Sequence, residues 1–342
     1  MFWLTVIVKN GFIKVSSRIE GDVMTQRVLP NLFLMGMPRS GTKLLRTLLN
    51  NHTKIFIPEF ETDFIPSVIA EFAGRELSER DVSRAVRKIK GSSFFYYYLK
   101  KYEFDFDRLM LRHGCTIYDI LRAFFFELRG GAIENYAYVG DKSPRNMRSC
   151  VILANGFPDA RFIHIVRDPR DYALSVKKAW GKNELRAILL WVKEITSFRN
   201  AIVADKKQFI EVRYEDLLAD PEAALRKCTE FLGLDYELDM VHLSAPVEKV
   251  GDARGAVIKR DNAGKYFKNM STAHIEKIDD YCVELLHLYG YPCSSERLYN
   301  KSISTVMDKV LQSLDAVSVL RLHIRKRGFR DGLVGIIRNS RY

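Results

Sequence analysis

The sequence predicts an α/β protein: a doubly wound, P-loop-like parallel sheet flanked by helices, with a helical insertion and a C-terminal helical tail. Three observations predict this fold class. Short apolar runs alternate with helical stretches along the chain. A glycine-bearing turn joins the first of these runs to a helix. Charged and hydroxyl side chains gather where the runs end, which is the edge at which parallel sheets carry their ligand sites.

Five apolar runs are expected to form the strands, and they lie at residues 31–35, 54–58, 136–140, 161–166 and 208–214. The gap between the second and the third run is too long for one crossover connection. We therefore expect a helical insertion on the acceptor side over residues 66–135, with helices at 79–90 and 116–129.

The two ends of the chain differ from this central part. Asn10-Gly11 lies between two short apolar runs and predicts a hairpin-like extension over residues 1–26. The main domain is expected over residues 27–300. Apolar residues at helical spacing, followed by basic residues, predict a basic amphipathic helical tail over residues 301–342.

Aromatic residues are expected mostly in the core. This applies to the dense run at residues 94–98, although some of its members are candidates for an acceptor pocket. Trp180 is also expected in the core, although it opens a second candidate acceptor segment with Lys182. His164 lies inside an expected strand and is predicted to be a buried, hydrogen-bonded histidine.

The turn after the first expected strand predicts an anion site. Glycines let the backbone curl tightly, and the amides of Ser40, Gly41, Thr42 and Lys43 are left without helical partners where the next helix begins. The helix dipole adds partial positive charge at this point. Arg39 and Lys43 add full charges, so a terminal phosphate or sulfate would be held from several sides.

The residue order in this loop is not that of a Walker loop. A Walker loop ends in Gly-Lys-Ser/Thr, whereas Gly41 is followed by Thr42 and then Lys43. The reversal moves the lysine onto the helix and misplaces the hydroxyl that would hold magnesium. We therefore expect a nucleotide-like anion to bind here without a metal ion.

A second cationic position follows the fourth expected strand. Arg167 lies at the carboxyl end of this strand, and Ser175 lies about two helical turns further on. A guanidinium and a hydroxyl can bind one phosphate together. A third segment, Arg213-Tyr-Glu-Asp-Leu217, begins where the fifth strand is expected to end.

These three segments resemble, in order and spacing over residues 31–291, the PAPS-dependent sulfotransferases. PAPS is 3′-phosphoadenosine-5′-phosphosulfate. The resemblance implies that the loop from Arg39 to Lys43 binds the 5′-phosphosulfate, and that Arg167 and Ser175 bind the 3′-phosphate.

The resemblance also implies contacts to the rest of the nucleotide. Tyr214 would lie near the adenosine. The family places a basic segment over the 3′-phosphate, and Lys259 and Arg260 are the candidates here. This segment departs from the Arg-Lys-Gly form of the cytosolic hormone and phenol enzymes, because Asp261 stands where that form has glycine.

A catalytic pair is implied as well. In the tyrosylprotein and bacterial branches a Glu-Thr pair after the second strand carries the base, and Glu61-Thr62 matches it. We expect Glu61 to be the general base, with Glu59 as the alternative if one insertion shifts the register. Lys142, two residues before Pro144, matches a lysine-x-proline that places an ammonium on the transferring group. The histidine base of the cytosolic enzymes has no convincing equivalent, which places the chain nearer the tyrosylprotein and bacterial branch.

The chain has a net charge of +12, and residues 321–342 hold seven Arg and Lys residues against one Asp. A basic amphipathic tail fits peripheral contact with an anionic membrane or polysaccharide, or a helix packed on the domain with a solvated end. A doubly phosphorylated cofactor and an acidic acceptor explain the basicity equally well, so no nucleic-acid partner is expected.

Cysteine usage and the amino-terminal run predict the compartment. Five widely spaced cysteines without a Cys-x-x-Cys pair argue against a disulfide framework or a zinc site. The amino-terminal apolar run is too short to span a bilayer. We expect a cytoplasmic enzyme, membrane-peripheral if the tail binds lipid, and the oligomeric state is left open.

The expected function is transfer of a sulfuryl group from PAPS to a hydroxyl or amine. Glu61 would deprotonate the acceptor, and Arg39 and Lys142 would stabilise the departing 3′,5′-bisphosphate, PAP. A carbohydrate, a lipid, a peptide tyrosine and a small phenol are all candidate acceptors. Two other classes stay open: a P-loop kinase that uses ATP and magnesium, and a non-catalytic basic module that binds membrane or nucleic acid.

Overall fold

The structure is a computed structural model, and it describes residues 4–9, 12–17, 28–111, 114–131, 133–202, 207–247 and 256–327. The turn predicted at Asn10-Gly11 and residues 328–342 of the basic tail lie outside the described residues.

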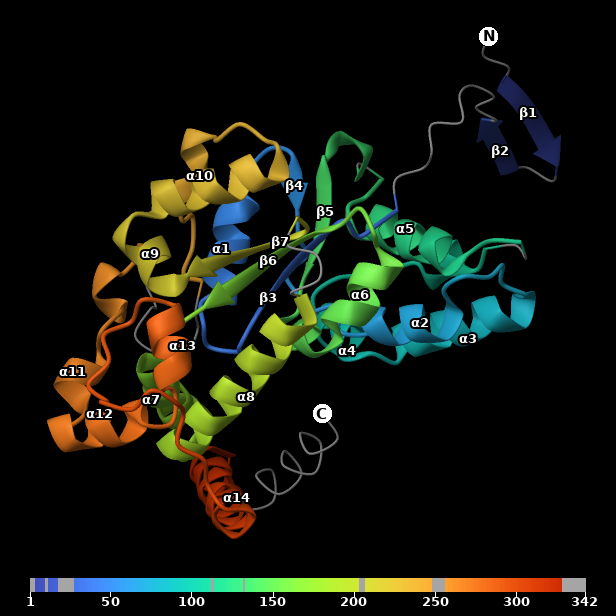
Figure 1. Ribbon diagram of the computed structural model, residues 1–342. Helices are drawn as coiled ribbons and strands as arrows, with labels where there is room; N and C mark the ends of the chain where they lie inside the picture. Colours follow the sequence, from blue (N-terminus) through green and yellow to red (C-terminus); the bar gives the residue numbers. More distant parts are fainter. Residues whose placement is uncertain are drawn as a thin grey trace.

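A five-stranded parallel sheet forms the centre of the molecule (Figure 1). Its strands are β3 (Leu32–Gly36), β4 (Ile55–Phe56), β5 (Tyr138–Lys142), β6 (Arg161–Val166) and β7 (Phe209–Arg213), in the spatial order β4-β5-β3-β6-β7. Every neighbouring pair runs parallel, which confirms the predicted fold class. The chain builds one side of β3 first and then the other, so the carboxyl end of β3 is the switch point at which such sheets bind ligands.

Alternate side chains of β3 enter two separate cores. Leu32 and Leu34 belong to one core and Phe33 and Met35 to the other, and all four are fully buried. The first core is covered by α1 (Thr42–Leu49), α9 (Tyr214–Ala219) and α10 (Pro221–Leu232). The second is covered by α6 (Cys150–Gly156), α7 (Pro169–Trp180) and α8 (Glu184–Ile202). Burial on both faces is the physical reason that the strands are continuous apolar runs.

The expected insertion consists of α2 (Ile65–Phe72), α3 (Glu79–Lys90), α4 (Ser93–Tyr98), η1 (Phe106–Leu109), α5 (Ile117–Leu128) and η2 (Ile133–Asn135). α3 starts where predicted because Ser78 and Asp81 form a reciprocal capping box. In the aromatic run, Phe94 and Phe95 are buried as expected, whereas Tyr96 and Tyr97 are exposed.

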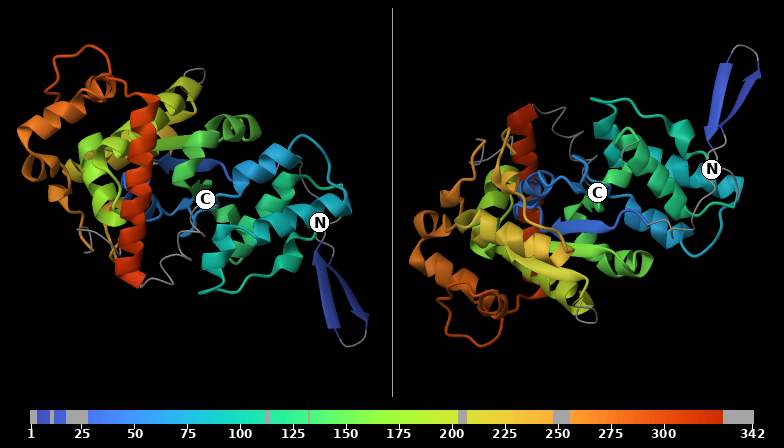
Figure 2. Two further views of the ribbon diagram at one scale, coloured as in Figure 1. Left: turned by 90° about the horizontal axis from the view of Figure 1, so that it is seen from below. Right: turned by 90° about the horizontal axis from the view of Figure 1, so that it is seen from above.

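The segments after the sheet are η4 (Leu238–Val241), η5 (Arg260–Asn262), α11 (Tyr266–Asn269), α12 (Thr272–Asp279), α13 (Val283–Leu288) and α14 (Thr305–Arg327). Figure 2 shows α11–α13 and the insertion at opposite ends of the molecule, with α14 as a long outer helix. Near the amino terminus, β1 (Leu4–Lys9) and β2 (Phe12–Ser17) pair antiparallel as a separate two-stranded sheet. None of the helices in the described ranges combines the length and the apolar character needed to cross a membrane.

Candidate functional site

The loop between β3 and α1 has the backbone of an anion cradle. Gly41 immediately precedes α1 with a φ of 95°. Arg39 has a φ of 76°, a left-handed conformation that is strained for a residue with a side chain and that is concentrated at functional sites. Within the described residues no side chain caps α1, and its first turn contains no acidic residue. The positive end of the helix dipole is therefore presented to the loop.

Ser40 indicates that this cradle is built for a ligand. The residue is 0% exposed, and its hydroxyl has no hydrogen-bond partner among the residues that the structure describes. Burying such a group without a partner costs roughly 1–3 kcal/mol, which a bound anion would offset. The expectation that the Ser40 amide faces the ligand is wrong. This amide donates to the carbonyl of Met37 at 3.0 Å and closes the turn.

Arg167, at the end of β6, joins two parts of the site. Its Nη1 donates to the backbone oxygen of Arg39 at 3.0 Å, and its Nη2 donates to the backbone oxygen of Asn262 at 3.0 Å. Its guanidinium lies 4.6 Å from the centroid of the Tyr214 ring. The Nε atom is buried without a hydrogen-bond partner in the described part of the chain. The protein therefore holds this buried guanidinium in place and leaves one N–H for an anion.

The structure brings Ser175 to the same region. Ser175 lies in the second turn of α7, and its Oγ accepts a hydrogen bond of 3.3 Å from Arg39 Nε. Arg39 thus stands between Ser175 and Arg167, since it contacts both. The two phosphate positions predicted from separate segments are adjacent.

Two residues outside the predicted set organise this region. Asn262 Nδ2 donates to the Tyr214 hydroxyl at 2.6 Å. The carboxylate of Asp171 accepts from the amides of Gly264 at 2.7 Å and Tyr266 at 2.9 Å. Burial raises the pKa of Asp171, while the charge of Arg167 opposes that shift. Together these contacts hold the segment after η5 against the end of β6.

A signal for Asp171 was present in the sequence. Asp171 follows Arg167 by four residues where a helix is expected to begin, and this spacing puts two side chains on the same face of a helix. In the structure, Arg167 Nη2 and Asp171 Oδ2 are 4.0 Å apart. Asn262 had no comparable local signal. Lys259 and Arg260 begin this same segment and are exposed, so their contact with the nucleotide stays a prediction.

Glu61 and Lys142 form an ion pair at the same edge of the sheet. Lys142 Nζ, at the end of β5, lies 2.8 Å from Glu61 Oε1. Lys142 is 1% exposed, whereas the Glu61 side chain is 44% exposed. The ammonium of Lys142 is therefore enclosed by the protein, whereas the Glu61 side chain is partly open to solvent.

Asp141 ties the Glu61 loop to β5. Its buried carboxylate accepts hydrogen bonds from the Thr62 amide at 3.1 Å, from the Thr62 hydroxyl, from Ser143 Oγ at 2.8 Å and from Asn146 Nδ2. Burial raises the pKa of Asp141 to about 6, although the hydrogen bonds from Thr62 and Ser143 act in the opposite direction. Asn146 belongs to η3 (Pro144–Ser149), so three chain segments meet at this carboxylate.

The neighbouring carboxylates have different partners. Glu59, the alternative base, pairs with Lys101 Nζ at 2.9 Å, on the exposed surface. Asp63 Oδ2 accepts from Ser93 Oγ at 2.9 Å, and burial raises the pKa of Asp63. Within the described residues only Glu61 of these three carboxylates forms an ion pair with Lys142, and its role as the base stays a prediction.

The prediction that Trp180 is a core residue is wrong. Trp180 is the last residue of α7 and is 37% exposed, because the helix ends at a left-handed Gly181 on the surface. Lys182 Nζ lies 5.4 Å from the centroid of its ring, and burial lowers the pKa of Lys182. The prediction for His164 is confirmed in part: it is buried with Nδ1 3.0 Å from Glu211 Oε1, whereas its Nε2 is buried without a hydrogen-bond partner among the described residues.

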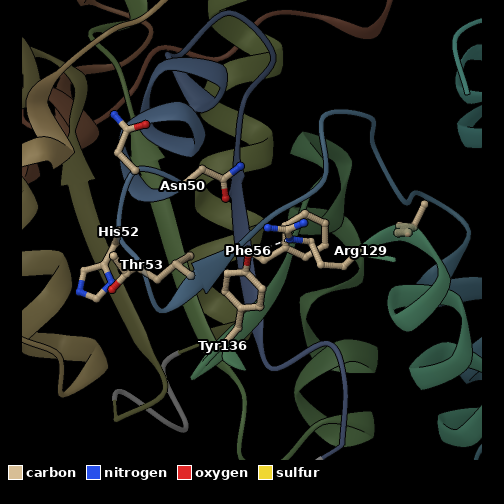
Figure 3. Close-up of a pocket in the computed structure, with 9 residues that line it drawn as sticks. Asn50, His52, Thr53, Phe56, Arg129 and Tyr136 are labelled. Carbon is tan, nitrogen blue, oxygen red and sulfur yellow. Dashed lines mark hydrogen bonds between the residues drawn. The ribbon is translucent and has the colours of Figure 1, made fainter. Parts of the chain in front are cut away.

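A pocket of about 410 Å³ lies at the edge of the sheet opposite the candidate site, where the strands begin (Figure 3). It is between the end of α1 and the starts of β4 and β5. Its polar side chains are bonded within the protein. Asn50 exchanges two hydrogen bonds of 2.7 Å with the backbone of Ile57, and Arg129 Nε donates to the Tyr136 hydroxyl at 2.7 Å. None of the predicted site residues lines this pocket, so it is separate from the candidate site.

The chemistry of the candidate site defines a class of enzyme. Two adjacent cationic positions suit a donor that carries two phosphate-like groups, and an ion-paired carboxylate beside them suits removal of a proton from an acceptor. In the ranges that the structure describes, no group of three His, Cys, Asp or Glu side chains could hold a metal ion. The site is that of a group-transfer enzyme with a nucleotide donor.

Comparison with known proteins gives the family. The model of the sulfotransferase family matches residues 30–238, so the chain belongs to the sulfotransferase family, the PAPS-dependent transferases of sulfuryl groups. Protein-tyrosine sulfotransferase A of Caenorhabditis elegans is 23% identical over 91% of this chain and 70% of its own length. Protein-tyrosine sulfotransferase 2 of Gallus gallus is 25% identical over 68% of this chain and 58% of its own length.

The solved structures agree on the fold. A sulfotransferase domain of a Synechococcus olefin synthase matches with a TM-score of 0.51 and 22% identity, over 78% of this chain and 96% of that domain. A sulfotransferase domain of the curacin biosynthetic pathway matches with a TM-score of 0.50 and 20% identity, over 78% of this chain and all of that domain. The kinase and binding-module alternatives receive no support from these comparisons.

Proposed function

We propose that this sulfotransferase moves the sulfuryl group of PAPS to the phenolic hydroxyl of a protein tyrosine. The observation that carries the proposal is the Glu61–Lys142 pair, 2.8 Å apart. Lys142 pairs in register with Leu34 of β3, the strand that leads into the cradle, and the Glu61 side chain is 44% exposed. The names of the relatives from Caenorhabditis elegans and Gallus gallus support tyrosine as the acceptor.

The residues of the cradle fit the donor. We propose that the loop from Arg39 to Lys43 holds the 5′-phosphosulfate, where the Ser40 hydroxyl lacks a partner among the described residues. Arg167 and Ser175 would hold the 3′-phosphate, because both contact Arg39 and Arg167 retains a buried N–H. When bound, PAPS supplies the sulfuryl group and a phosphate leaving group.

Tyr214 and the basic segment would complete the nucleotide site. Tyr214 is buried, packs on Gly41 and stacks with Arg167, so its place beside the cradle supports a position near the adenosine. Lys259 and Arg260 would cover the 3′-phosphate, since Asn262, two residues after Arg260, contacts Arg167.

The acceptor step would use the two charged groups at the end of β5. Glu61 accepts the proton of the acceptor hydroxyl as the oxygen attacks sulfur. Lys142 is poised within the same pair to stabilise the negative charge on the transferring group and the leaving phosphate, together with Arg39. A carboxylate is a weak base for a phenol, so most of the rate enhancement would come from positioning and charge.

A lipid alcohol is the second candidate acceptor. A Mycobacterium bovis relative, 27% identical over 44% of this chain and 40% of its own length, is named omega-hydroxy-beta-dihydromenaquinone-9 sulfotransferase Stf3. No comparison supports a carbohydrate over these two.

The test has a binding part and a transfer part. PAP at about 100 times its dissociation constant should stabilise the protein by about 2.7 kcal/mol, and ATP with magnesium should not. Label from the sulfuryl group of PAPS should then appear in a tyrosine peptide and not in its phenylalanine counterpart. Stabilisation by ATP alone would overturn the donor assignment. Label only in a long-chain alcohol would replace tyrosine by a lipid acceptor.

We also propose a reducing, cytoplasmic location. The support is that all five cysteines have free thiols, three of them buried in the core. Alkylation of the intact protein in lysate, followed by mass measurement before and after reduction, tests this. A fraction that reacts only after reduction would contradict it.

A further inference from the structure

The C-terminal helix α14 is anchored to the domain through one face. Leu311 and Asp315 are buried on this face. The carboxylate of Asp315 accepts a hydrogen bond of 2.6 Å from the Asn183 amide and one of 2.9 Å from Arg186 Nη1. Asn183 directly precedes α8, so the carboxylate also complements the positive end of that helix dipole. These contacts set the rotation of α14 about its own axis.

Beside the anchored face, α14 carries an apolar stripe made of Val306, Met307, Val310, Leu314 and Val317. These side chains are 46–72% exposed. At 100° per residue they fall within an arc of about 100° on the helix surface. Figures 1 and 2 show α14 at the outside of the molecule, with α8 on one side of it. A contiguous apolar surface of this kind marks an interaction site.

Basic residues continue the stripe. Arg321 is exposed and follows Val317 at a spacing of four, which keeps it on the same side of the helix. Arg325, Lys326 and Arg327 then end α14. Residues 321–342 together hold seven Arg and Lys residues and one Asp, a net charge of +6. An apolar stripe with a basic end is the composition of helices that lie in a lipid interface.

Charge distinguishes between the partners that could cover the apolar stripe. A second copy of the chain packed with its α14 parallel to the first would bring one basic helix end, which begins at Arg321, close to another, and like charges oppose such self-association. A nucleic acid or an acidic polysaccharide would pair with the basic residues but would leave the apolar stripe in water. A bilayer with anionic lipid buries the stripe and attracts the basic residues at the same time.

We infer that α14 docks this enzyme on an anionic lipid surface through the apolar stripe and the basic residues that follow it. This inference is independent of the acceptor. Because Asp315 fixes α14 to the start of α8, docking would hold the whole domain in one orientation on the bilayer rather than tether it by a loose segment.

The experiment is co-sedimentation of the full-length protein with vesicles of phosphatidylcholine, alone or with about 30% phosphatidylserine, at about 0.1 M salt. We expect binding to be about tenfold tighter or more with phosphatidylserine, and to weaken as salt rises. The double variant Val310→Asp/Leu314→Asp should lose about tenfold or more in affinity. The triple variant Arg325→Ala/Lys326→Ala/Arg327→Ala should lose a similar factor and much of the salt dependence.

A matched control is Leu238→Asp, which changes an exposed leucine of η4 that is 74% exposed and lies outside the stripe. It should bind vesicles as the wild type does. Stabilisation by PAP in every variant shows that the domain is folded and separates this inference from the proposed function.

Three outcomes would overturn the inference. They are vesicle binding that survives Val310→Asp/Leu314→Asp, equal binding to neutral and anionic vesicles, and absence of vesicle binding by a protein that responds to PAP. A dimer in solution that the same double variant dissociates would assign the stripe to a second copy instead. Retention of the wild type on DNA, with no vesicle binding, would assign the basic end to nucleic acid.

Discussion

Lys142 Nζ lies 2.8 Å from Glu61 Oε1, although the Lys142 side chain is buried and the Glu61 side chain is exposed. Lys142 is enclosed at the end of β5, whereas Glu61 belongs to a surface loop after β4. A buried ammonium is costly without a counter-charge, so the pair holds the loop closed onto the sheet. The same contact leaves the Glu61 side chain 44% exposed, as the proposed role of a base for the acceptor requires.

The first prediction concerns the base. Glu61→Gln keeps the size of the side chain and removes the proton acceptor, so kcat should fall by roughly 10²–10⁴-fold while PAP still binds. The matched control is Glu59→Gln, two residues earlier, whose carboxylate is paired with Lys101 on the surface. Its kcat should stay within a few-fold of the wild type. The reverse result, with Glu59→Gln inactive and Glu61→Gln active, would exchange the two assignments.

The second prediction concerns the 3′-phosphate. Arg167→Ala removes a guanidinium with a buried N–H that has no partner in the described residues. A hydrogen bond to a charged group contributes roughly 1.5–3 kcal/mol, so the affinity for PAP should fall by about tenfold to 150-fold. The affinity of the variant for adenosine 5′-phosphosulfate, which lacks the 3′-phosphate, should fall much less.

Calorimetric titration of both ligands into wild type and Arg167→Ala checks this. Arg226→Ala is the control, because Arg226 pairs with Glu222 on the exposed surface of α10. An equal loss for both ligands would show that Arg167 maintains the loop through Arg39 and Asn262 rather than binding the 3′-phosphate.

The third prediction concerns the backbone of the cradle. Gly41 has a φ of +95°, and a Cβ atom there would overlap the ring of Tyr214. Gly41→Ala should therefore displace Tyr214 and weaken PAP binding by about tenfold or more. Gly233→Ala is the matched control, because Gly233 also has a positive φ of +65° but nothing within 4 Å of an added Cβ.

Thermal unfolding with and without PAP distinguishes the two glycine variants. Gly233→Ala should cost about 1 kcal/mol of stability through backbone strain and leave PAP binding intact. If Gly41→Ala also binds PAP normally, the close packing of Tyr214 on the loop is not required for the nucleotide site.

The fourth prediction is a pH dependence of stability. Burial raises the pKa of Asp141 to about 6, above the roughly 3.9 of an exposed aspartate. A carboxyl that binds its proton more tightly when folded contributes stability at low pH and loses that contribution as pH rises through the folded-state pKa. The free energy of unfolding of the wild type should therefore exceed that of Asp141→Asn by more at about pH 5 than at about pH 7.5.

Urea unfolding at the two pH values provides the measurement. Asp216→Asn, at a 61% exposed position of α9, controls for general effects of losing a carboxylate. A wild-type advantage that grows with pH would mean that the donors from Thr62, Ser143 and Asn146 outweigh burial and keep Asp141 ionised.

Much of the fold could be predicted because its signals are local. The apolar runs located all five strands to within two residues at every end. The Ser78–Asp81 capping box explains why α3 begins where periodicity predicted it. The structure brings Glu61, Lys142, Arg167 and the loop after β3 to one edge of the sheet for a related reason. Each follows a strand, and parallel strands bring their carboxyl ends to one edge.

Sequence reasoning missed the contacts that link distant segments. Asp141 holds Thr62 across 79 residues, Asp171 holds Gly264 across 93, and Asn262 reaches Tyr214 across 48. No periodicity relates such positions. Trp180 was misplaced for a similar reason, since its burial depends on where Gly181 ends α7 relative to the surface.

The sequence by itself determined the order of strands and helices, the glycine-containing loop after β3 and the kinds of side chain that lie at the carboxyl ends of the strands. Those properties follow from local conformational preference and from burial of apolar runs, which act over a few residues. Only the tertiary structure decided that Glu61 rather than Glu59 meets Lys142, that Arg39 lies between Arg167 and Ser175, and that one stripe of α14 stays uncovered. These are distances between groups far apart in the chain, and packing of the whole domain is what sets them.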